Sequence, residues 1–206
     1  MHRILNIAGN EKNNDDLIEH PKADFIFITS VKADINIISD LINDKEFNSF
    51  KNNIRALEIS NLNTFAQIDN YFNKTINYAK VVVLRLFGDK GTWGYGIENL
   101  IKWKESKINR TLLILSGTEE EDLSLNELSS INLDTSMKIT KLLRSGGREN
   151  YRRFLYCLNY FLANDTNIPN KYISSVSYPD PYLYDWKNEK GFKVGIISYK
   201  SLFLAN

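Results

Sequence analysis

The chain has 206 residues, of which 43% are apolar and 25% are charged, a balance typical of a globular protein with one full domain. Its 26 basic and 25 acidic side chains give a formal net charge of +1, and because the two signs are interspersed, no global field favours nucleic acid or a membrane surface. The single cysteine, Cys157, excludes an intramolecular disulfide framework and fits a reducing compartment. We find no signal peptide pattern and no apolar run near the ~20 residues that span a bilayer, so we predict a cytoplasmic protein.

The chain as far as residue 60 alternates short apolar runs with one helical pattern. The apolar runs predict three strands, at 3–8, 24–29 and 53–60. Between the second and the third of these strands, apolar residues recur at helical spacing and predict a helix over 31–42.

The next helix begins at Thr64, which together with Gln67 fits a capping box. The apolar face of this helix is predicted to consist of Phe65, Ile68, Phe72, Ile76 and Ala79. The helix leads into 81–87, the most apolar strand in the sequence, which Arg85 alone interrupts. A strand that is apolar on both faces requires a sheet covered by helices on both sides, so we predict that 81–87 is an interior strand.

A loop rich in glycine follows this strand and contains Gly88, Gly91, Gly94 and Gly96. Because such loops can hold a phosphate at a helix N-terminus, this loop is the first candidate for a nucleotide site. A P-loop, however, needs Lys and then Ser or Thr after its last glycine, where this sequence has Ile97 and Glu98. The dinucleotide pattern lacks its third glycine, because residue 99 is Asn. We therefore favour a structural turn that holds Trp93 and Tyr95 against a neighbouring surface, with nucleotide binding as the alternative.

The second half of the chain begins with a helix whose apolar positions are Ile97, Leu100, Ile101 and Ile108. A strand is predicted at 111–115, followed by helices over 134–144 and 148–162. Asp134 or Thr135 is expected to cap the first of these two helices. Its buried residues are predicted to be Met137, Leu142 and Leu143.

Strands that alternate with helices predict an α/β fold with an open, mostly parallel sheet and helices on both faces, of the Rossmann or flavodoxin-like kind. We assign this head domain to residues 1–163. Residues 164–191 have little periodicity but contain prolines and aromatic residues, so we predict an extended, aromatic-anchored linker. A strand at 192–199 predicts that 192–206 is the start of a further domain, truncated in this chain.

Arg85 is the first candidate for a functional side chain, because a buried guanidinium must be paired. The favoured interpretation is an ion pair within the protein, with Glu98 or Asp89 as the partner. The alternative is an arginine that binds the carboxylate of a ligand at the edge of the sheet.

The residues that could ligate a metal or act as nucleophiles are scattered. His2 and His20 are the two histidines, and their spacing to Cys157 matches no zinc, cobalt or iron site. Cys157 lies in an amphipathic pattern, which favours a packed thiol over a nucleophile. We predict no catalytic residue and no metal ligand in this chain.

Four stretches of the chain carry a resemblance to a known family. They are ADFIFITSVKADI (23–35), AKVVVLRLFGDKGTWGYGIENL (79–100), LLRSGGRENYRRFLYCLNYFL (142–162) and KVGIISYKSLFLAN (193–206). In this order they resemble the N-terminal region of the cobaltochelatase large subunit, the CobN type, a relative of the magnesium chelatase H subunit. Gly94 stands where this family often has Pro, and Lys200 where Arg is usual.

The resemblance implies an ATP-dependent system of cobalamin biosynthesis that inserts cobalt into a corrin precursor, hydrogenobyrinate a,c-diamide. Its implied partners are AAA+ ATPase subunits, the tetrapyrrole and the rest of the large subunit, with neither nucleic acid nor a membrane. The full complex would use ATP with magnesium, and cobalt as substrate, whereas this chain is expected to bind no cofactor and not to be catalytic alone.

Three side chains are the predicted contacts to the tetrapyrrole or to a partner: Arg85, Trp93 and Tyr95. The aromatic pair is chosen because macrocycles stack on aromatic faces. Two alternative functions stay open, a porphyrin-binding part of a magnesium chelatase H-type subunit and a stand-alone nucleotide- or phosphate-binding α/β protein.

Overall fold

Four parallel strands form the sheet at the centre of the computed structural model, which describes residues 17–118, 123–165 and 167–177. In these residues the strand order is β2-β1-β3-β4. The strands are β1 (Phe25–Thr29), β2 (Ile54–Glu58), β3 (Val81–Leu86) and β4 (Thr111–Ser116). β3 pairs with β1 on one side and with β4 on the other, and all its residues are buried. The predicted interior strand is therefore confirmed for 81–86, whereas Phe87 lies beyond its end and is exposed. The strand predicted at 3–8 lies outside the described residues.

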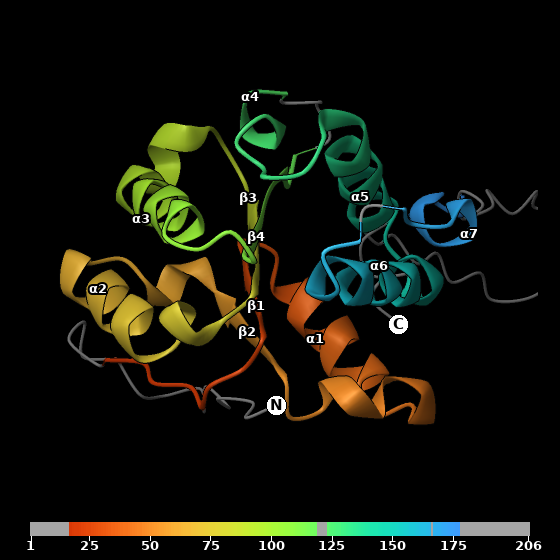
Figure 1. The fold of residues 1–206 in the computed structure, drawn as a ribbon, viewed down its shortest axis with the longest axis horizontal. Coiled ribbons are helices and arrows are strands. Elements are labelled where there is room, and N and C mark those ends of the chain that lie inside the picture. Colours follow the sequence, from red (N-terminus) through yellow and green to blue (C-terminus); the bar gives the residue numbers. More distant parts are fainter. Residues whose placement is uncertain (1–16, 119–122, 166, 178–206) are drawn as a thin grey trace, which may run out of the picture.

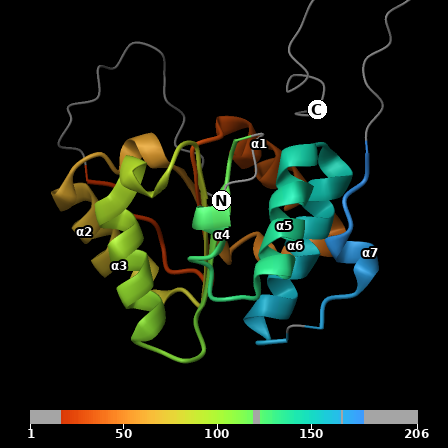
Figure 2. The same ribbon diagram turned by 90° about the horizontal axis from the view of Figure 1, so that it is seen from above.

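Helices cover both faces of this sheet, as Figures 1 and 2 show. One face carries α1 (Lys32–Leu41), α5 (Leu133–Ser145) and α6 (Arg148–Leu162), and the other carries α2 (Phe65–Lys74) and α3 (Gly94–Glu105). The short helices are α4 (Leu123–Asn126) and α7 (Asn170–Ile173). This arrangement confirms the predicted open α/β fold with helices on both faces.

Alternation along β3 divides the core into two layers. Val81 and Val83 pack with α1, α5 and α6, whereas Val82, Leu84 and Leu86 pack with α2 and α3. Because the chain passes from β1 to β2 in one direction and from β3 to β4 in the other, β1 and β3 form the topological switch point. In open α/β sheets, ligands bind outside the carboxyl ends of the strands at this point, so the segments after β1 and β3 are the first candidates for a binding site.

The start of α2 follows the predicted capping box. The Thr64 hydroxyl accepts a hydrogen bond from the backbone N–H of Gln67 at 3.2 Å, and the Gln67 side chain accepts one from the Thr64 N–H at 3.1 Å. Two orphan donors of the first turn are thereby satisfied, which confirms the helix start that the sequence predicts.

Two residues predicted on apolar helix faces are exposed instead. Phe65, the first residue of α2, is 70% exposed, and Ile108, which lies beyond the end of α3 at Glu105, is 97% exposed. Both predictions extended a helical face past the turns that pack on the sheet. Ile76 and Ala79 are buried as predicted, but they follow α2 rather than belong to it.

The cap of α5 also differs from the prediction. Asn132, not Asp134 or Thr135, is the N-cap, and its Oδ1 accepts a hydrogen bond from the backbone N–H of Thr135 at 2.8 Å. Asn is as good a cap as Asp because its short side chain reaches the same amide. Leu142 and Leu143 are buried as expected, whereas Met137 is only half-buried.

Part of the predicted linker 164–191 is folded against the head domain. α7 lies within it, Ile173 is buried, and the ring of Tyr172 stacks on Tyr156 of α6 with centroids 4.5 Å apart. A helix of four residues has no periodicity to detect, so its sequence reads as coil. The strand predicted at 192–199 lies outside the described residues, and the proposed division into domains stays a prediction.

Candidate functional site

The three predicted contact residues do not form one site. The side chain of Arg85 points to the α1 and α6 face of the sheet, where it contacts Asp34 and Tyr151. Trp93 and Tyr95 belong to the opposite layer, with α2 and α3. One ligand cannot contact all three side chains from the same side of this sheet.

Arg85 is held in a buried polar network. Its Nη1 donates to Oδ1 of Asp34 at 2.7 Å and to the Tyr151 hydroxyl at 3.2 Å, and that hydroxyl in turn donates to Asp34. The second carboxylate oxygen of Asp34 accepts a hydrogen bond from Thr29 at 2.7 Å. The predicted ion pair exists, but its partner is Asp34 in the first turn of α1 rather than Glu98 or Asp89.

The charged pair at the centre of this network is almost completely shielded from solvent. The side chain of Arg85 is 7% exposed and that of Asp34 is 1% exposed. Burial and the Asp34 carboxylate raise the pKa of Tyr151 well above its usual value of 10, so its hydroxyl stays protonated and serves as a donor. The arrangement suits a fixed structural charge pair that joins α1, β3 and α6.

The glycine loop holds Trp93 in the core. The indole N–H of Trp93 donates to the backbone oxygen of Leu62 at 3.0 Å, and the ring lies against Gly96 so closely that a Cβ there would come within 2.3 Å of it. Earlier in the loop, Asp89 accepts a hydrogen bond from the backbone N–H of Gly91 at 2.8 Å. The Asp89 carboxylate therefore occupies a backbone N–H group that would otherwise be available to a phosphate.

Tyr95 lies nearer the surface. Its hydroxyl donates to Asp69 at 2.7 Å, and this hydrogen bond is the main reason that the pKa of Tyr95 is raised above its usual value. Its ring packs on that of Phe65 with centroids 4.5 Å apart. Because Phe65 is largely exposed, this pair places an aromatic surface on α2 and α3 that solvent and partners can reach.

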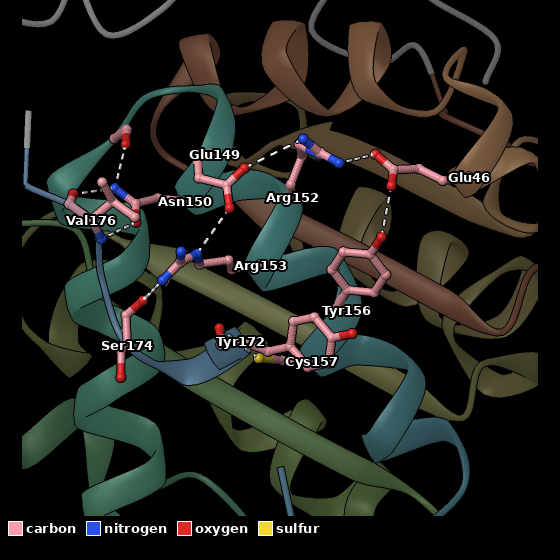
Figure 3. Close-up of polar contacts among 11 residues, drawn as sticks. Glu46, Glu149, Asn150, Arg152, Arg153, Tyr156, Cys157, Tyr172, Ser174 and Val176 are labelled. Carbon is pink, nitrogen blue, oxygen red and sulfur yellow. Dashed lines mark hydrogen bonds and ion pairs between the residues drawn. The ribbon is translucent and has the colours of Figure 1, made fainter. Parts of the chain in front are cut away.

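A second group of polar side chains lies on the outer face of α6 (Figure 3). Glu149 accepts hydrogen bonds from Arg152 at 3.4 Å and from Arg153 at 3.0 Å. Arg152 continues to Glu46, 2.7 Å away, and Glu46 accepts a hydrogen bond from the Tyr156 hydroxyl at 2.7 Å. The hydrogen bonds from Tyr156 and Arg152 lower the pKa of Glu46. The bond between Tyr156 and Glu46 also raises the pKa of Tyr156.

Asn150 and Arg153 extend this group to the main chain beyond α7. The amide of Asn150 bonds both the N–H and the C=O of Val176, at 2.7 and 2.9 Å, and Arg153 donates to the carbonyl of Ser174 at 2.6 Å. In the sequence, only the family resemblance of residues 142–162 marks Asn150 and Arg153 as part of a functional region. No local pattern identifies these contacts, because the partner residues follow 21 to 26 positions later.

The cysteine and histidine positions fit structural roles. Cys157 is fully buried in α6 and burial raises the pKa of its thiol to about 12, which confirms a packed thiol. The Nδ1 atom of His20 lies 2.9 Å from the Tyr71 hydroxyl, while His2 lies outside the described residues. In the ranges that the structure describes, no three His, Cys, Asp or Glu side chains gather as metal ligands do, and no helix has the length and apolarity to cross a bilayer.

Known proteins resemble this chain both in sequence and in structure. The sequence is 30% identical over 105 residues to the aerobic cobaltochelatase subunit CobN of Pseudomonas aeruginosa, an alignment that covers 51% of this chain and 8% of that protein. The structure matches the catalytic subunit of cobaltochelatase from Mycobacterium tuberculosis with a TM-score of 0.57 and 18% identity, over 90% of this chain and 14% of that one. No protein-family model matches the sequence.

Both matches are to cobaltochelatase subunits, one by sequence and one by fold. The sequence match confirms the resemblance to the CobN type, and the structural match shows a shared fold. The chain spans only a small part of the length of either relative. The relation to the magnesium chelatase H subunit stays a prediction.

Proposed function

We propose that this chain forms the N-terminal portion of an ATP-dependent cobaltochelatase large subunit, which inserts cobalt into hydrogenobyrinate a,c-diamide. The observation that carries the proposal is the match to CobN by sequence, joined by a fold match that covers 90% of the chain. In this proposal the portion is not catalytic alone, and AAA+ ATPase subunits supply the hydrolysis of ATP with magnesium. Cobalt and the tetrapyrrole are substrates of the whole complex.

The proposal is tested by adding the purified chain in trans to a CobN protein that lacks the matching segment. With the ATPase subunits, ATP, magnesium, Co²⁺ and the diamide, we expect the shortened CobN to be inactive and the added chain to restore cobalt insertion. The matched control is the Asp34→Ala variant, which removes the carboxylate of the buried network. Cobalt insertion by the chain without CobN, or full activity of the shortened CobN, would contradict the proposal.

We further propose that Tyr95, together with Phe65, contacts the macrocycle or a partner of the complex. Tyr95 is the predicted contact residue whose ring is paired with an exposed aromatic side chain, and large aromatic surfaces favour stacking on a flat ligand. Trp93 lies nearby in the same layer, so its fluorescence reports on ligands bound there.

Titration of the chain with the diamide should quench tryptophan fluorescence in the unmodified chain and less in Phe65→Ala. The control is Phe87→Ala, which removes another exposed ring, 46% exposed, from the end of β3. A titration that stays flat up to millimolar ligand would reject this contact without affecting the assignment to the large subunit.

A further inference from the structure

The face of α6 that carries Asn150 and Arg153 forms hydrogen bonds to the main chain of residues 174–176. Oδ1 of Asn150 accepts from the N–H of Val176 at 2.7 Å, and Nδ2 donates to the C=O of the same residue at 2.9 Å. Arg153 donates to the C=O of Ser174 at 2.6 Å. Figure 3 shows both side chains reaching the stretch from α6.

The side-chain amide of Asn150 forms the two hydrogen bonds that a residue on a neighbouring β-strand would form. In an antiparallel pair, two opposite residues exchange both of their N–H···O bonds. Asn150 makes the same two bonds to Val176 with one side chain. Residues two apart in an extended chain direct their polar groups to the same edge, which explains why Ser174 and Val176 are both bonded from α6.

Each of the two side chains also has a hydrogen-bond partner outside 174–176. Asn150 is fully buried, and its Nδ2 also donates to the backbone oxygen of Gly146 at 2.8 Å. Gly146 and Gly147 have φ values of 64° and 76°, which L side chains rarely adopt, so the turn before α6 depends on glycine there. Arg153 is oriented by Glu149 at 3.0 Å. The sequence SGGREN (145–150) thus supplies Asn150 and the Glu149 carboxylate that orients Arg153.

We propose that the face of α6 formed by Asn150 and Arg153 is a docking surface for an extended main chain, and that these two side chains hold residues 174–176 against the α/β unit. The surface recognises backbone groups, so it fits an extended segment whatever the side chains at positions 174 and 176. In this chain it is occupied by 174–176, directly before the described residues end at Ser177. The inference goes beyond the proposed function and does not depend on it.

The first test measures hydrogen exchange at the Val176 amide in the full 206-residue chain. Loss of the two hydrogen bonds to Asn150 is expected to speed exchange at least about tenfold in Asn150→Ala. The control is Asn159→Ala, an exposed position on the same helix, where we expect a change within about twofold. An amide of Val176 that exchanges at the rate of an unstructured peptide in the unmodified chain would overturn the proposal.

The second test asks whether binding of residues 174–176 depends on their backbone N–H and C=O groups. A nitroxide on Ser177→Cys reports local motion, and labelling is selective because the one native cysteine, Cys157, is buried with a raised pKa. Val176→Pro removes the N–H that Asn150 accepts from, whereas Val176→Ala keeps it. We expect a sharper spectrum, from faster motion, in Val176→Pro but not in Val176→Ala.

This pair of variants decides the question even if Asn150→Ala unfolds the domain, because residue 176 lies outside the core. Equal spectra for Val176→Pro and Val176→Ala would overturn the proposal. Arg153→Ala is expected to mobilise the label to a smaller extent, because it removes one contact instead of two. Arg152→Ala releases Glu46 and one oxygen of Glu149 but keeps the Glu149–Arg153 pair, so it should leave the label unchanged.

Discussion

On the α2 and α3 face of the sheet, β3 presents only aliphatic side chains, whereas on the α1 and α6 face it presents two valines and Arg85. The first face is closed by close packing, seen best where the Trp93 ring lies on Gly96. The second is closed in part by directional bonds, because Asp34 of α1 and Tyr151 of α6 both meet the guanidinium.

The two faces are therefore sensitive to different kinds of substitution. Apolar packing is non-directional and tolerates change as long as volume is kept, whereas a buried charge is tolerated only while its partner remains. We therefore expect removal of one charge to destabilise the fold through the α1 and α6 face. On the α2 and α3 face, one added methyl group is expected to be enough.

The largest effect is expected from Arg85→Met, which leaves the Asp34 carboxylate buried without its cation. Breaking a buried pair from one side costs about 3–5 kcal/mol, measured as the free energy of unfolding in denaturant. The double variant Arg85→Met with Asp34→Leu should recover much of this loss, because no charge is then left buried. A double variant whose loss equals the sum of the single losses would show that the two side chains do not act as a pair.

Gly96→Ala tests the packed face with one added methyl group. A Cβ at this position would lie 2.3 Å from the Trp93 ring, which is anchored by its bond to Leu62, so we expect a loss of about 1–3 kcal/mol. Gly94→Ala is the matched control in the same helix, since its Cβ would meet nothing within 4 Å. The control should be neutral or more stable by up to about 1 kcal/mol, so similar melting temperatures for the two variants would argue against this contact.

Thr64→Ala removes the cap of α2 and is expected to cost about 1 kcal/mol in thermal or chemical unfolding. Asn132→Ala should cost a similar amount at the start of α5, on the other face of the sheet. Thr64→Ser keeps the hydroxyl and serves as the control. A loss at one helix but not at the other would show that the two faces differ in more than their buried charge.

The smallest effect concerns pH and Glu46. Its pKa in the folded protein lies below the ordinary value of 4.5, so its ionised form stabilises the fold above pH 4.5, and this contribution is lost as the pH falls through the lower folded pKa. Because the pair with Arg152 is partly exposed, the contribution is expected to be below about 1 kcal/mol. The stability gap between the unmodified chain and Glu46→Gln should shrink from pH 7 to pH 3. A gap that widens on acidification would contradict the sign.

Local patterns predicted much of the fold. The apolar run at β3, the capping box at Thr64 and the packed Cys157 are all confirmed, because each depends on residues close together in the chain. The exposed Phe65 and Ile108 were predicted wrongly, since helical spacing does not say where packing against the sheet ends.

The candidate sites were less predictable, because their partners come from distant segments. Glu98 is near Arg85 in sequence but lies on α3, which covers the opposite face of the sheet. Asn150 belongs to a stretch that the resemblance marks, yet its contact to Val176 exists only because α7 folds back on α6.

Local sequence was enough to predict the four described strands, the longer helices, the interior position of β3 and the need for a partner to Arg85, because hydrophobic periodicity and the cost of a buried charge act locally. That this partner is Asp34 depends on the folded arrangement of distant segments. The pairing of β1 with β3 sets Thr29 opposite Arg85, and α1 begins just after Thr29. Strand register thus brings together two charges that are 51 residues apart in the chain.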